Sequence, residues 1–257
     1  TGQATLAIAE GERAGRPLIT ALGSFTDLEV WSPNAPQVER VEAEPPDLPP
    51  PDECISTADR PAPGLMKRLD LRLMYVIETH AHESHLSAAP ALRAETGARL
   101  IAHSSADLAC VDMDVDDGDS IFVGEEYLRV MATPGHSPCS LSYLWRDRVF
   151  TGHTLLAGAA GPCQRADADA GRLFDSIRRR LFALPDETLV CPGRATGQRP
   201  VSSIGRERAA NTDLQPDTTR ERFINRKRAQ ARPGGGWRED SLAANRRCQL
   251  MNRTETI

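Results

Sequence analysis

The chain has 257 residues and a net charge of −5, with 31 basic and 36 acidic residues interspersed along it. This balance gives no reason to expect a nucleic acid as a partner, and no apolar run is long enough for a membrane span. A chain of this length can bury a substantial core as one α/β domain. The six cysteines form no C-x-x-C pair, so we expect free thiols in a reducing compartment.

The first 62 residues are predicted to form a divergent extension that lends strands to the domain behind it. Short β-rich runs predict strands at residues 5–9, 18–22 and 28–31. Residues 44–52 hold five prolines in nine positions, which predicts an extended connector, because proline continues neither a helix nor a central strand. We therefore expect an extension over residues 1–62 and one domain over 63–257, completed by part of that extension.

From residue 63 onward, strand patterns and helix patterns alternate. Apolar and β-branched runs predict strands at residues 71–77, 98–102, 120–123, 127–131, 141–145, 148–151 and 188–191. Helical periodicity and stop signals predict helices at residues 65–69, 88–96, 172–184, 203–211 and 220–231. Periodicity alone thus indicates a mixed α/β domain.

The segment 79–85 reads Thr-His-Ala-His-Glu-Ser-His and holds three of the six histidines of the chain. It follows a predicted buried strand, and the carboxyl ends of strands are where α/β folds usually place their chemistry. Imidazole is the commonest metal ligand in proteins, so this spacing favours a metal site. The alternative is a polar loop without a ligand.

This segment resembles the T-H-x-H-x-D-H signature of the metallo-β-lactamase superfamily, and more closely its persulfide dioxygenase branch, a neighbour of the glyoxalase II hydrolases. The resemblance runs from residue 63 to the C-terminus and implies an α/β fold, the αβ/βα sandwich of two mixed sheets with helices outside. Ser84 stands where the family has aspartate, with Glu83 one position early, and whether Glu83 substitutes is left open. Cys248 matches a C-terminal cysteine of the relatives and is expected to be a structural or incidental thiol.

The resemblance also implies a set of metal ligands. In the relatives, two histidines and one aspartate hold an iron ion. The two histidines match His80 and His136, the latter in a Thr-Pro-Gly-His turn, and the aspartate position is His153. A three-histidine site suits one Fe(II) or Zn(II) ion. The alternative is that no metal binds and that His153 only fills the place of a lost ligand.

The positions that face the substrate in the relatives are poorly kept. Pro162 replaces an arginine that helps to anchor glutathione, with Arg165 three residues later as a candidate substitute. Arg194 replaces a histidine of a Pro-Ala-His-Asp-Tyr turn and is the second candidate for substrate binding. Arginine stays protonated, so Arg194 is neither a metal ligand nor a general base. We assign no catalytic residue.

Scaffold positions thus persist where polar site positions are lost. We expect a catalytically inactive persulfide-dioxygenase-like protein that serves as a structural or accessory subunit of a larger assembly. The alternative is an active non-haem iron enzyme that oxidises glutathione persulfide with the three-histidine site. A hydrolase ranks third, because Ser84 removes a ligand of the family's second metal.

The surroundings of such a protein are also predicted. Residues 1–62 and the arginine-rich stretch 220–232 are the expected surfaces for protein partners. Eukaryotic relatives are commonly mitochondrial, and Thr1 rather than Met at the start fits a processed chain. We therefore expect a mitochondrial location, with the cytoplasm as the alternative.

Overall fold

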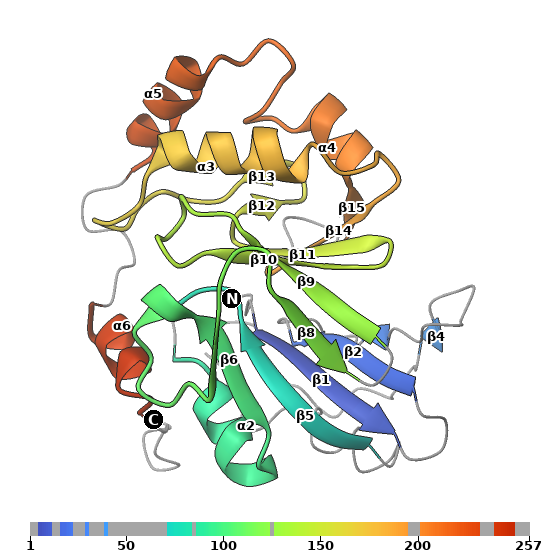
Figure 1. The fold of residues 1–257 in the computed structure, drawn as a ribbon. Coiled ribbons are helices and arrows are strands. Elements are labelled where there is room, and N and C mark those ends of the chain that lie inside the picture. Colours follow the sequence, from blue (N-terminus) through green and yellow to red (C-terminus); the bar gives the residue numbers. More distant parts are fainter. Residues whose placement is uncertain are drawn as a thin grey trace, which may run out of the picture.

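The fold is a sandwich of two β-sheets with helices on the outside, seen in a computed structural model (Figure 1). The structure describes residues 5–11, 16–22, 29–30, 39–40, 71–83, 86–123, 126–194, 201–231 and 239–249, with the backbone alone described before residue 72. The α/β sandwich predicted for the chain is therefore confirmed. None of the described helices is long and apolar enough to cross a membrane.

The first sheet has the strand order β2-β1-β5-β6-β7. Its strands are β1 (Thr5–Gly11), β2 (Arg16–Leu22), β5 (Leu71–Glu78), β6 (Arg99–His103) and β7 (Met113–Val115). The strand β1 pairs antiparallel with both β2 and β5, whereas β5, β6 and β7 run parallel. The N-terminal strands thus extend the sheet that carries the histidine-rich segment.

The second sheet has the strand order β15-β14-β11-β10-β9-β8. Its strands are β8 (Ser120–Val123), β9 (Glu126–Ala132), β10 (Leu141–Trp145), β11 (Arg148–Gly152), β14 (Leu189–Pro192) and β15 (Ser202–Ser203). Only β11 and β14 pair in parallel among these strands. Two further antiparallel pairs are described, β3 (Glu29–Val30) with β4 (Glu39–Arg40) and β12 (Leu155–Leu156) with β13 (Ala159–Ala160).

Several helix ends have clear capping residues. Gly97 ends α2 (Ala89–Thr96) with φ 72°, a left-handed conformation that glycine adopts without steric cost. Side chains of Asp169, Ser203 and Thr219 accept backbone N–H bonds at the starts of α3 (Ala170–Ser176), α4 (Ile204–Ala210) and α5 (Arg220–Gln230). The structure also describes a 3₁₀-helix at Ser104–Ala106 and α6 (Glu239–Arg246).

The core has layers that match this architecture. Apolar residues of both sheets, including Ile77, Leu141 and Tyr143, fill the space between the sheets. A second cluster, with Leu173, Ile177 and Phe223 among its members, joins the outer face of the second sheet to α3, α4 and α5. Close packing of these side chains therefore fixes the distance between the two sheets. The loops at one end of the sandwich are anchored on these packed strands.

Several predictions about local structure need correction. The helix expected over 172–184 starts at Ala170 and continues from Ile177 to Leu181 as a π-helix. Neither β7 nor α6 was predicted. Cys110 and Cys248 form a disulfide, so the expectation of free thiols is wrong for this pair. The connector 44–52 and the helix at 65–69 lie outside the described residues, and the division at residue 62 stays a prediction.

Candidate metal centre

His80 lies two residues after the end of β5, and the backbone just before it is hydrogen-bonded to the second sheet. The backbone N–H of Leu141 donates to the Thr79 carbonyl at 2.8 Å, and the Tyr143 hydroxyl donates to the Glu78 carbonyl at 2.8 Å. The Thr79 hydroxyl lies 3.0 Å from Nδ1 of His80, which fixes the ring and leaves its Nε2 to face the interior. Both sheets thus hold this imidazole in place.

His136 lies in the turn between β9 and β10, held against α3. Gly135 has φ 143°, and a Cβ there would lie 2.3 Å from backbone atoms of Leu173, so only glycine allows this approach. Nδ1 of His136 lies 2.7 Å from the Pro162 carbonyl, and since a carbonyl only accepts, this nitrogen carries the proton. Nε2 therefore holds the free lone pair, as a metal ligand requires.

His153 comes directly after β11, in a turn that packs on the start of the histidine-rich segment. Gly152 has φ 51°, and a Cβ there would lie 2.5 Å from the Thr79 hydroxyl. The Gly193 N–H donates to the Gly152 carbonyl at 2.8 Å, which joins the turn to the end of β14. A glycine thus precedes both His136 and His153, and each allows the close contact that aims the following side chain.

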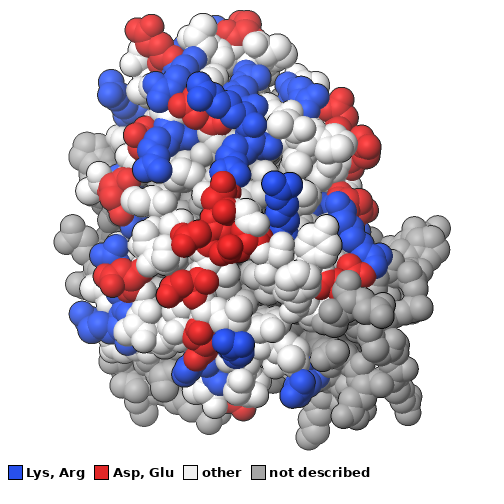
Figure 2. Space-filling model, in the orientation of Figure 1, with Lys and Arg blue, Asp and Glu red and all other residues white. Residues whose placement is uncertain are grey.

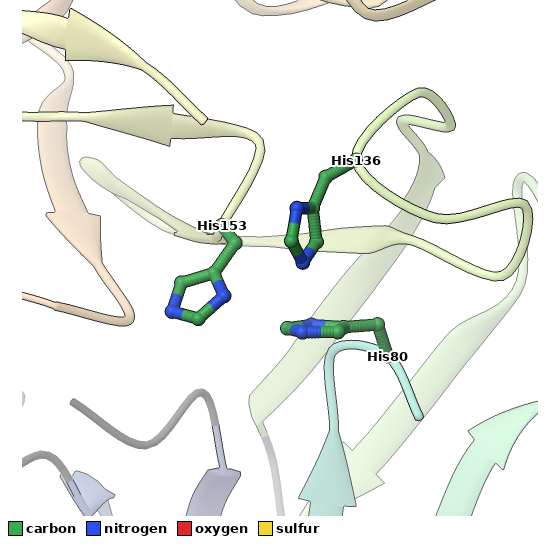
Figure 3. A group of neighbouring side chains, drawn as sticks. All are labelled: His80, His136 and His153. Atoms are coloured by element: carbon green, nitrogen blue, oxygen red, sulfur yellow. The ribbon is translucent and has the colours of Figure 1, made fainter. Parts of the chain in front are cut away.

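The three imidazoles converge on one point, as Figure 3 shows. One nitrogen from each of His80, His136 and His153 lies within 4.8 Å of the other two, and all three residues are buried. Their ring centroids are 4.7 to 5.0 Å apart. Within the described part of the chain, Nε2 of His80 and Nε2 of His136 have no hydrogen-bond partner. Buried nitrogens that lack a partner are costly, so this arrangement fits a bound cation.

Burial keeps the rings of His80 and His136 in the neutral form that binds metals. Burial is the main cause that lowers the pKa of His80 well below its ordinary value, followed by the neighbouring His82, His136 and His153. Burial likewise lowers the pKa of His136, against an opposing effect of the Glu83 carboxylate. Both imidazoles are therefore neutral at pH 7, with a lone pair available for a metal ion.

His82 and Asn245 support the segment from behind, and sequence reasoning assigned a role to neither. Nε2 of His82 lies 3.2 Å from the Glu78 carboxylate, to which the Ser87 hydroxyl also donates. The Asn245 amide donates to the His82 carbonyl at 2.9 Å and accepts from the Ser87 N–H at 2.8 Å. The C-terminal helix α6 therefore fastens both ends of the loop that follows His80.

The two predicted substrate-binding arginines lie in different settings. Arg165 is buried, binds both oxygens of Asp167 at 2.7 Å and donates to the Ala81 carbonyl at 2.8 Å. It also lies 3.5 Å from the Glu83 carboxylate, so Arg165 borders the histidine cluster. Arg194 is exposed just beyond the end of β14. A substrate contact of either residue stays a prediction.

Two cysteines that flank the cluster are structural in their contacts. The Sγ of Cys139 accepts the Ala81 N–H at 3.4 Å, which supports the turn after His80. Burial raises the pKa of the Cys163 thiol to about 11. A thiol that ionises this late is a poor nucleophile at neutral pH.

Comparisons with known proteins agree with this geometry. The sequence model of the Metallo-beta-lactamase superfamily matches residues 55–194. The mitochondrial persulfide dioxygenase ETHE1 of Homo sapiens is 33% identical over 165 residues, which cover 63% of this chain and 65% of that protein. The hydroxyacylglutathione hydrolase of a Polaromonas species is 38% identical over 128 residues, 48% of each chain. The crystal structure of ETHE1 from Myxococcus xanthus has a TM-score of 0.72 at 30% identity, with coverage of 95% of this chain and 98% of that one.

Proposed function

Since the chain belongs to the metallo-β-lactamase superfamily, we propose that it is a metal-dependent enzyme of the persulfide dioxygenase type. Its metal, Fe(II), is held by His80, His136 and His153. The convergence of three buried imidazole nitrogens is the observation that supports the proposal most directly. The similarity to the persulfide dioxygenase ETHE1 of Homo sapiens and to the ETHE1 structure from Myxococcus xanthus supports the choice of reaction. The match spans 65% of the human relative, so the activity of the whole relative is part of the proposal.

The protein's own residues have defined tasks in this reaction. Ferrous iron supplies the redox chemistry by which a glutathione persulfide, dioxygen and water give glutathione, sulfite and two protons. Thr79 and the Pro162 carbonyl orient the rings of His80 and His136 through their Nδ1 atoms. Burial of the ligands excludes bulk water from the nitrogens, which strengthens their interaction with a cation.

The expectation of an inactive scaffold gains no support from the comparisons, since the relatives are enzymes by name. The structure also brings three buried histidines together, and two of them, His80 and His136, have a ring nitrogen without a hydrogen-bond partner among the described residues, which is costly unless a cation binds there. The hydrolase relatives favour a second candidate, in which Zn(II) at the same histidines activates water. Ser84, the residue that weakens this candidate, lies outside the described residues.

Metal content and oxygen uptake test the proposal together. The purified protein is analysed by inductively coupled plasma mass spectrometry and then loaded with Fe(II) without oxygen. We expect one metal per chain and oxygen uptake with glutathione persulfide, both lost in His80→Ala. His103→Ala is the matched control, because His103 bonds to the 3₁₀-helix and to Asp116 away from the cluster. An iron-loaded chain that consumes no oxygen contradicts the dioxygenase, and a folded chain without metal revives the scaffold.

Location and partners complete the proposal. A mitochondrial location is supported by the names of the mammalian relatives. For protein partners we keep the surfaces 1–62 and 220–232. Figure 2 shows blue side chains gathered over α3 and α5, with red ones among them. Ion pairs of Arg220 with Asp175 and of Arg226 with Asp213 neutralise part of this charge. Native mass spectrometry that finds only a free monomer or a homodimer would contradict a larger assembly.

A further inference from the structure

Glu83 brings a carboxylate to the histidine cluster. Its Oε1 lies 3.6 Å from Nε2 of His136, the nitrogen left with a free lone pair by the bond between Nδ1 and the Pro162 carbonyl. The Glu83 side chain is 13% exposed and His136 is 1% exposed, so little solvent lies between them. The carboxylate therefore lies beside the ligand atom of His136, at the edge of the group formed by His80, His136 and His153.

The separation of these two atoms suits a shared ion. Hydrogen bonds between nitrogen and oxygen are typically about 2.7–3.2 Å long, so 3.6 Å is too long for a good one. Zinc binds imidazole nitrogen and carboxylate oxygen at about 2.0–2.2 Å, which places two such ligands of one tetrahedral ion about 3.4 Å apart. The observed distance is close to this value, so Oε1 of Glu83 and Nε2 of His136 can ligate the same ion.

Arg165 faces the second oxygen of Glu83. Its guanidinium is fixed by two bonds to Asp167 and one to the Ala81 carbonyl, and its Nη1 lies 3.5 Å from Oε2 of Glu83. The charge of Arg165 is balanced by Asp167. The Glu83 carboxylate therefore remains as the negative charge available to the cluster, with one oxygen 3.5 Å from Arg165 and the other 3.6 Å from His136.

We propose that Glu83 is the carboxylate ligand of the metal centre, so that this chain binds its ion through three histidines and one glutamate. Three neutral imidazoles alone would leave a divalent cation without a compensating charge beside buried Arg165, and Glu83 supplies that charge. The carboxylate lost at His153 is thus replaced from position 83. The inference rests on the metal site of the proposed function, and it goes beyond it by changing the ligand set.

Metal affinity measured by competition with a chromophoric chelator tests the inference without reference to activity. Glu83→Gln keeps the size of the side chain, and we expect it to weaken Fe(II) and Zn(II) binding by at least about tenfold. Glu95→Gln, at an exposed position on α2, is the matched control and should bind as the wild type does. Wild-type affinity in Glu83→Gln overturns the inference but leaves the three-histidine site intact. Absence of metal binding in the wild type overturns both.

A double variant that moves the carboxylate from position 83 to position 153 distinguishes a metal ligand from a residue with a structural role only. In Glu83→Gln/His153→Asp, a carboxylate returns at position 153, and we expect metal affinity to recover above that of Glu83→Gln. A residue that only positioned Arg165 would give no such recovery. If Glu83→Gln does not fold, a crystal structure of the zinc-loaded wild type decides. A Glu83 oxygen within about 2.2 Å of the ion supports the inference, and one beyond about 3 Å overturns it.

Discussion

Reduction of the Cys110–Cys248 disulfide is expected to destabilise the protein by several kcal/mol. The two cysteines are separated by 138 residues, so the bond closes a long loop in the unfolded chain. The chain-entropy model assigns about 5 kcal/mol to a loop of this length, and measured losses of native disulfides are about 2–5 kcal/mol. We therefore expect the free energy of unfolding to fall by about 2–5 kcal/mol on reduction.

The effect should extend to the metal centre, because the disulfide anchors the end of α6. Asn245, in the last turn of that helix, bonds to the His82 carbonyl and the Ser87 N–H. The backbone N–H of Ala109 also donates to the Arg246 carbonyl at 2.8 Å. Without the disulfide these bonds must hold α6 alone, so we expect weaker metal binding in the reduced protein.

Urea denaturation with and without a phosphine reductant measures the stability difference. The reductant should lower the midpoint of the wild type and leave Cys110→Ser/Cys248→Ser unchanged, since that variant has no disulfide to lose. A midpoint of the wild type that does not respond to reductant would refute the reasoning. So would alkylation of Cys110 and Cys248 in the unreduced, unfolded protein, detected by mass spectrometry.

Three further predictions concern single residues near the cluster. Gly152→Ala should lower the free energy of unfolding by about 1–3 kcal/mol and lower the metal content, because its left-handed φ disfavours a side chain and the new Cβ meets Thr79. Calorimetry measures the stability and zinc titration the metal content, and wild-type values of both contradict the prediction. Tyr143→Phe should cost about 0.5–1.5 kcal/mol in urea, because the buried hydrogen bond to the Glu78 carbonyl is lost; an unchanged midpoint contradicts it. The raised pKa of Cys163, about 11 against an ordinary 9.0, favours the folded state below pH 9 and costs stability as pH rises toward 11. Cys163→Ala should therefore lose less stability over that interval in urea titrations, and an identical loss contradicts the assignment.

The elements that local signals define were predictable from the sequence. Gly97 ends α2 where the sequence predicts a stop, because its left-handed conformation is set by the residue type. The hairpin of β10 and β11 follows from alternation on either side of Arg146 and Asp147. The run that forms β5 is apolar on both faces, since the sheet interior and α2 cover it. In each case the information lies within a few residues.

The elements that depend on distant partners were not predictable. The helix α6 has a polar composition, and Leu242 packs against a small cluster around Ala81 and Ala106 that only the folded chain creates. The disulfide joins cysteines 138 residues apart, and spacing alone does not pair them. The change from α-helix to π-helix at Ile177 likewise has no local signal that we recognise.

The same distinction applies to the histidine cluster. His80, His136 and His153 each follow a strand or a turn glycine, so position-by-position resemblance was enough to nominate them, and the structure brings them together. The partners of their Nδ1 atoms were harder to foresee. Pro162 was considered only for the side chain it lacks, whereas its carbonyl orients His136. Every residue has a backbone carbonyl, so the residue type does not reveal which carbonyl accepts the hydrogen bond.

The prediction of an inactive protein came from comparing the site positions with those of the family one at a time. That comparison does not consider how the charged side chains are arranged in space. Three imidazoles beside Arg165 would be a poor cation site if the arginine were unpaired, but Asp167 pairs with it at 2.7 Å. Glu83 then leaves one negative charge at the cluster, 3.6 Å from His136. With a neutral ligand at position 153, the cluster therefore keeps its affinity for a cation only if the residue at position 83 is acidic. By this reasoning Glu83→Gln and His153→Asp should shift metal affinity in opposite directions, and shifts in the same direction would show that the two positions do not share the task.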